Sequence, residues 1–200
     1  GQTTANGSGN WSFTPGVALP DGAVVNVVAR DAAGNSSGVA TTTVDTVPPP
    51  TPTVEPSNGT LLAGTAEAGA RVILTDGGGN PIGQTTADGS GHWSFTPGTA
   101  LANGTVVNVQ ARDAAGNGSG IATTTVDSVA PPTPTIDPSN GTQLAGTAES
   151  SATVILHDGN GNLIGTTQAD GSGHWSFTPS PALANGTTVN AVAQDAAGNT

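Results

Sequence analysis

The sequence contains no cysteine, no methionine and no tyrosine, and its 200 residues include only three tryptophans and three phenylalanines. Disulfide bonds and thiolate chemistry are therefore excluded. No apolar run approaches the ~20 residues of a membrane-spanning helix, so we expect no direct membrane contact. With so few large side chains, each folded unit has a thin core. In the absence of disulfides, bound metal or neighbouring units would have to support it.

Basic residues are almost as scarce. The sequence has no lysine, and its three arginines stand against 14 acidic residues, which gives a formal net charge of −11. Nucleic-acid binding needs clustered lysine and arginine on the phosphates, and anionic membrane surfaces attract the same cations. We therefore expect no nucleic-acid partner. An acidic surface is better suited to divalent cations, which take carboxylate oxygens as ligands.

One period organises what the sequence does contain. Trp11, Trp93 and Trp175 are 82 residues apart, and residues 1–46 differ from residues 83–128 at only 10 positions. A fixed period indicates an array of like units. The expected domains are the C-terminal part of a repeat at 1–46, a complete repeat at 47–128, and a repeat at 129–200 that lacks its last strand. If these partial repeats stood alone, they could complement one another between chains.

Glycine and proline interrupt every window, so helix is not expected, and short β-branched runs predict strands instead. The complete repeat is expected to hold seven strands, at residues 51–55, 60–66, 71–75, 81–87, 93–96, 105–112 and 121–126. Successive side chains along residues 105–112 point to opposite faces of the strand, which places Val107, Val109 and Ala111 on the inward face. Trp93 and Phe95 are expected on the inward face as well. Val72, Leu74, Ile82 and Leu101 are expected to complete the core. Seven short strands with regular turns predict an all-β, antiparallel sandwich of immunoglobulin (Ig) type.

The acidic residues follow the poles of this sandwich. Loops after the second, fourth and sixth strands share one end with the domain's N-terminus, where the linker from the preceding repeat arrives. Four carboxylates from separate segments are thus expected at each junction. They are Asp45, Glu67, Asp88 and Asp113 at the first junction, and Asp127, Glu149, Asp170 and Asp195 at the second. Carboxylates combined with loop carbonyls, and with the Asn117 amide as an additional ligand, predict an interdomain calcium site.

These acids have an ordinary explanation as well, because Asp before Gly is a common turn residue whose carboxylate bonds nearby backbone. Asn6 replaces Asp88 in the first copy, which weakens the case for that position as a ligand. Asp45 and Asp127 lie in linkers, where no turn is expected to need them, and the DAAGN aspartates Asp113 and Asp195 are likewise harder to explain as turn residues. Solvated turn acids therefore remain the alternative to calcium ligands.

Catalysis is not expected. His92 and His174 are replaced by Asn10 in the first copy, and His157 by Thr75 in the middle copy, whereas a catalytic residue would not be exchanged between such similar repeats. No nucleophile elbow of the GxSxG type occurs either. These residues fit exposed strand and turn positions.

Four motifs recur in fixed order: the VDxVxPPxP linker, AGTAE, DGSGHWSFTP, and RDAAGN or QDAAGN. In this combination the chain resembles the bacterial Ig-like tandem repeats of giant secreted surface adhesins, of the RTX or biofilm-associated type. The resemblance covers all 200 residues. It implies a rod of tandem sandwiches on the bacterial cell surface, cell adhesion and biofilm formation, with calcium holding the domain junctions rigid.

The sequence thus predicts a structural spacer of an extracellular adhesin, which extends a distant binding tip away from the cell. Its partners would be adjacent repeats of the same chain, and the proline-rich linkers would limit rotation between them. The alternative is a repeated weak binding module that recognises a glycan, ice or a second copy of the chain and acts through avidity.

Overall fold

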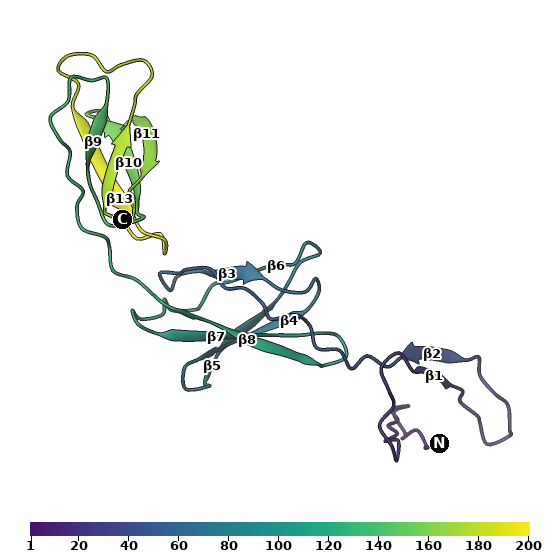
Figure 1. Ribbon diagram of the computed structural model, residues 1–200. Helices are drawn as coiled ribbons and strands as arrows, with labels where there is room; N and C mark the ends of the chain where they lie inside the picture. The colour runs from purple at the N-terminus through teal and green to yellow at the C-terminus, as the bar shows by residue number, and fades with distance from the viewer.

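The computed structural model describes residues 1–200 and consists of 13 β-strands without an α-helix. Figure 1 shows three units in succession along an extended chain, with the N-terminal hairpin at one end and the third repeat at the other. No helix long and apolar enough to cross a bilayer occurs. The all-β, tandem architecture expected from the repeat is confirmed.

The middle repeat contains two packed layers. One is the four-stranded antiparallel sheet β5-β4-β7-β8, and the other is the pair β3-β6. The strand bounds are β3 Leu62–Thr65, β4 Arg71–Asp76, β5 Pro81–Thr86, β6 His92–Phe95, β7 Val106–Arg112 and β8 Gly118–Thr125. In Figure 1 the pair β3-β6 lies over the larger sheet, as in an Ig-like sandwich.

The same arrangement returns in the third repeat. Strands β11-β10-β13 form one sheet and β12-β9 the other. Their bounds are β9 Leu144–Thr147, β10 Thr153–Asp158, β11 Leu163–Gln168, β12 His174–Phe177 and β13 Val189–Gln194. The first unit contributes one antiparallel hairpin, formed by β1 (Val24–Val27) and β2 (Ala40–Thr43).

The middle repeat has six strands instead of the predicted seven. The expected first strand, residues 51–55, does run beside β3. Thr53 N–H donates to the Thr65 carbonyl at 2.8 Å, and Glu55 N–H donates to the Ala63 carbonyl at 2.9 Å. A regular ladder does not form along this segment, because Pro52 lacks an N–H and Pro56 follows directly.

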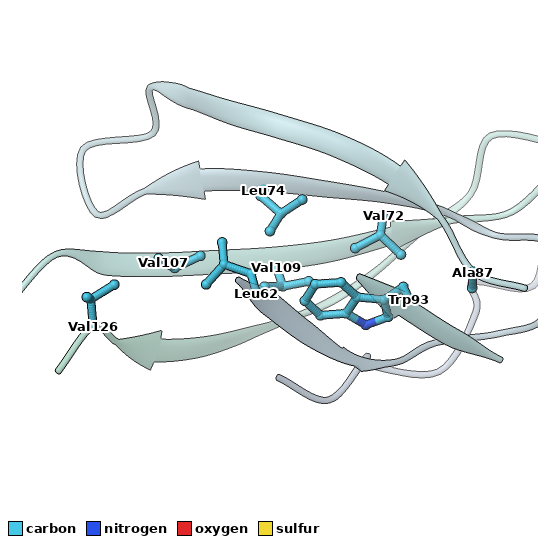
Figure 2. Packing of buried hydrophobic residues seen from close by; sticks show 8 residues of the cluster. All are labelled: Leu62, Val72, Leu74, Ala87, Trp93, Val107, Val109 and Val126. Carbon is cyan, nitrogen blue, oxygen red and sulfur yellow. The ribbon is translucent and has the colours of Figure 1, made fainter. Parts of the chain in front are cut away.

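The core lies between the layers, as Figure 2 shows around the Trp93 ring. The side chains at 107, 109 and 111 are fully buried, and Trp93 is 3% exposed, which confirms the predicted faces. Phe95, Ile82 and Leu101 pack against this cluster from its margin. Trp175 occupies the equivalent place in the third repeat. The indole N–H groups of Trp93 and Trp175 are buried without a hydrogen-bond partner.

Candidate functional site

The loop that follows β7 is closed by its own aspartate. Asp113 Oδ1 accepts hydrogen bonds from the Gly116 and Asn117 N–H groups at 2.7 and 2.9 Å, and Oδ2 accepts one from Asn117 Nδ2 at 2.8 Å. Gly116 has φ 97°, a backbone conformation that favours glycine. Contrary to the sequence-based expectation, the motif DAAGN therefore encodes a self-contained turn, and Asp31–Asn35 and Asp195–Asn199 form it as well.

In two of these loops the asparagine also reaches the preceding unit. Asn117 Nδ2 donates to the Asp45 carbonyl oxygen at 3.0 Å, and Asn199 Nδ2 donates to the Asp127 carbonyl oxygen at 2.8 Å. Each bond joins residues that are 72 positions apart. The two junctions are therefore held by the same direct contact between a loop and the linker before it. The sequence suggested the Asn117 amide only as an additional cation ligand.

The influences on the pKa of the loop aspartate differ between these two loops and the first one. At Asp113 and Asp195 burial is the largest influence and raises the pKa. The hydrogen bonds from Asn117 and Asn199 and from the loop N–H groups outweigh it, so that each pKa lies below 3.8. At Asp31 the largest influence is the Asn35 side chain, which lowers the pKa. Asp113 and Asp195 are half-buried and Asp31 is exposed, and the first two lie in folded sandwiches at a junction whereas the first unit consists of one hairpin.

A partly open pocket of about 200 Å³ lies at the second junction. Three of the four acids expected there, Asp127, Glu149 and Asp195, line it. The other lining residues are Pro56, Ser57, Thr124 and Thr125 of the middle repeat, and Ser150, Ser151, Ala152, Ala196 and Ala197 of the third. At the first junction, Asp45 and Asp113 are brought together through Asn117, and Glu67 begins the turn that Ala70 N–H closes at 3.0 Å.

Two of the expected ligands are placed in turns of their own. Asp88 Oδ1 accepts hydrogen bonds from the Ser90 and His92 N–H groups at 2.8 and 3.0 Å. Asp170 accepts the equivalent bonds from Ser172 and His174 and does not line the pocket. These bonds hold the pKa of both aspartates below its usual value. Asp88 and Asp170 are therefore turn residues, which is the alternative to calcium ligands that the sequence left open.

The linker aspartates also build a local turn, contrary to the sequence-based expectation. Asp45 Oδ1 accepts a hydrogen bond from Val47 N–H, and Asp127 Oδ1 accepts one from Val129 N–H, both at 3.0 Å. Their carboxylates fix the start of the proline-rich linker, and their carbonyls receive the asparagine. An aspartate side chain readily accepts a hydrogen bond from the backbone N–H two residues later, which forms the turn seen at both linkers.

The chemistry of the second junction suits a calcium ion, since three carboxylates and neighbouring carbonyls are oxygen ligands of the kind that calcium prefers. No three acidic or histidine side chains, however, are arranged closely enough to hold a metal ion. Closure of the pocket around an ion would have to bring them together.

Comparison with known proteins gives one family. The family model described as bacterial Ig domain matches residues 48–128 and 130–200. No curated protein matches. Among solved structures, the chain is similar to the BSP domain of a biofilm associated protein, with 20% identity and a TM-score of 0.37. The match covers 72% of this chain but only 26% of that one.

Two vertebrate structures are similar in the same coarse sense. The first is the chicken CNTN1 FN1–FN3 domains, with 14% identity and a TM-score of 0.44; the match covers 88% of this chain and 70% of that one. The second is a segment of two fibronectin type III domains from chicken tenascin, with 14% identity and a TM-score of 0.28; the match covers 72% of this chain and 87% of that one. The two tandem family matches, together with the sandwich topology, confirm the Ig-like resemblance of the sequence. The chain belongs to the bacterial Ig domain family.

Proposed function

We propose that this chain is a spacer segment of a bacterial cell-surface adhesin, which holds a distal binding tip away from the cell for attachment and biofilm formation. The observation that carries the proposal is the repeated junction, in which Asn117 contacts Asp45 and Asn199 contacts Asp127 by the same bond. A junction that repeats with the sequence sets a repeated domain geometry, as a spacer requires. Near-identical units with thin cores also suit a role in which length and number matter.

Calcium at the junctions is the second part of the proposal. Asp127, Glu149 and Asp195 line one pocket between two domains, so an ion that drew their carboxylates together would find oxygen ligands on both sides of the junction. An ion shared by two domains would restrict their relative motion further than the linker alone. Calcium tolerates irregular oxygen geometry, which a site built from loops requires.

Small-angle scattering of the chain in calcium and then in excess chelator tests both parts. We expect a long, well-defined maximum dimension in calcium that broadens after chelation. A profile that is already broad in calcium contradicts the spacer. A long profile that is identical under both conditions retains the spacer and removes calcium from it.

A pair of variants tests the placement of the ion. Glu149→Gln removes a carboxylate that lines the pocket, whereas Asp170→Asn alters a turn acid outside it. We expect Glu149→Gln to weaken calcium binding in calorimetry and Asp170→Asn to leave it close to the wild-type value. Equal affinities in the two variants would contradict a site in this pocket.

A repeated weak binding module is the second candidate, and one observation favours it. Val39 and Ile121 hold equivalent positions in two repeats and are 64% and 61% exposed; Val39 directly precedes the threonine-rich strand β2, and Ile121 lies within the threonine-rich strand β8. Such a surface, repeated along a chain, could bind a glycan, ice or another copy through avidity. Two results together would leave only the spacer: a sedimentation coefficient that does not change with protein concentration, and bacterial adhesion that is unchanged by Ile121→Ser.

A further inference from the structure

We infer that Asn117 and Asn199 are interdomain clamps, which fix each domain to the linker before it without any bound ion. The inference rests on the proposed spacer function and names the side chains that would set its stiffness. An asparagine amide carries two N–H donors. At both junctions one donor bonds the aspartate of its own loop, and the other bonds the linker carbonyl.

The first of these bonds prepares the second. Asp113 receives the Asn117 amide at 2.8 Å and its backbone N–H at 2.9 Å, so the side chain is already oriented before the linker arrives. A donor that is held in place loses little conformational freedom when it binds, and more of the bond energy is therefore available to restrain the domains. Asp113 and Asp195 thus act as positioning residues for the clamp.

Other loops of this chain show that the clamp is not simply a property of the turn. Asn80 and Asn162 make the same pair of bonds to Asp76 and Asp158, at 2.8 to 2.9 Å. Neither of these asparagines bonds a neighbouring domain, because their turns lie at other places in the sandwich. The additional bond belongs to the two loops that face a linker, and it is present in both.

The linker carbonyl that accepts the asparagine N–H is also held in place. Asp45 and Asp127 fix their own linker by bonding Val47 and Val129, so each carbonyl is presented by a turn and not by a free chain. A prepared donor therefore meets a prepared acceptor at each junction. A cation in the neighbouring pocket could add to this restraint, but the bond itself needs only the two backbone turns and the asparagine.

Distance distributions across the second junction test the clamp. The chain has no native cysteine, so Ser94→Cys and Ser176→Cys, at equivalent exposed positions, accept spin labels for pulsed electron resonance. We expect Asn199→Ala to broaden the label distribution at least twofold in excess chelator. Asn199→Gln, which moves the amide outward and keeps its polarity, should broaden it as well.

Two variants serve as matched controls. Asn162→Ala removes the same turn bonds from the same repeat, and Asn117→Ala removes the clamp of the other junction. Both should leave the Ser94–Ser176 distribution unchanged, with circular dichroism confirming that every variant remains folded. A wild-type width in both Asn199 variants, or equal broadening in Asn162→Ala, would overturn the clamp. A wild-type distribution that is already broad in calcium would instead contradict the spacer function.

Discussion

At the scale of single residues, Gly64 shows how closely the sandwich is packed. It lies opposite Trp93 in the β3-β6 pair. A Cβ at this position would collide with the Thr53 carbonyl oxygen and would lie 3.0 Å from Trp93 Cζ2. Gly146 has the same surroundings in the third repeat, formed by Thr135 and Trp175. The glycine of AGTAE therefore leaves room for both the edge segment and the indole ring.

Gly64→Ala is expected to destabilise the middle repeat by about 1–3 kcal/mol, as overpacking in a filled core does. Gly98→Ala is the matched control, because no atom lies within 4 Å of the added Cβ and its backbone is unstrained. This control should change stability by less than about 0.5 kcal/mol. Urea unfolding followed by tryptophan fluorescence measures both. A Gly64→Ala midpoint equal to that of Gly98→Ala would contradict the packing argument.

At the scale of loops and strands, the Asp-to-Asn turn is the recurring device. Asp31, Asp76, Asp113, Asp158 and Asp195 each bond an asparagine four residues later. At Asp76 the Asn80 side chain is the largest influence and lowers the pKa below 3.8, with backbone N–H bonds adding to it. Each of these turns is consequently stabilised by the ionised form of its aspartate.

The pH dependence of stability follows in sign from these lowered pKa values. An aspartate whose folded pKa lies below its unfolded value contributes stability above the ordinary 3.8, and that contribution is lost as the pH falls through the folded pKa. We expect thermal midpoints that are level from about pH 7 to pH 5 and then fall toward pH 2. Circular dichroism melts measure this. The substitution Asp76→Asn should reduce the slope, and a level midpoint down to pH 2 would contradict the expectation.

At the scale of the whole molecule, repetition makes length adjustable. Residues 46 and 128 precede equivalent linkers, and the junction contacts of Asn117 and Asn199 differ by only 0.2 Å in length. A chain built in this way can gain or lose a repeat without creating a new junction. Stability should then depend on each repeat and its neighbours and not on the total length.

Deletion of residues 47–128 tests this modularity, because it joins Thr46 to Val129 and restores a VDxVxPPxP linker. We expect the maximum dimension from small-angle scattering to shorten by the length of one repeat, while the melting midpoint of the third repeat stays the same. The undeleted chain is the control. Aggregation, or a loss of stability in the third repeat, would show that the repeats depend on more than their immediate junction.

Much of the fold could be predicted from residue periodicity. Alternation in residues 105–112 placed Val107, Val109 and Ala111 in the core, since successive side chains of a strand point to opposite faces. The first strand was wrong in detail, because prolines interrupt its ladder although Thr53 and Glu55 still bond β3. Period and turn residues are local properties, which is why they can be predicted without the tertiary structure.

The junction shows what the sequence by itself could not determine. Composition and loop order predicted that acids would gather at each pole, and Asp127, Glu149 and Asp195 do line one pocket. Only the tertiary structure distinguished them from Asp170, which is occupied by its own turn, and only it placed Asn199 on the Asp127 carbonyl. The sequence determined the repeat, the sandwich and the turns through local spacing. Contacts between residues 72 positions apart depend on how two folded domains meet, so the structure alone decided them.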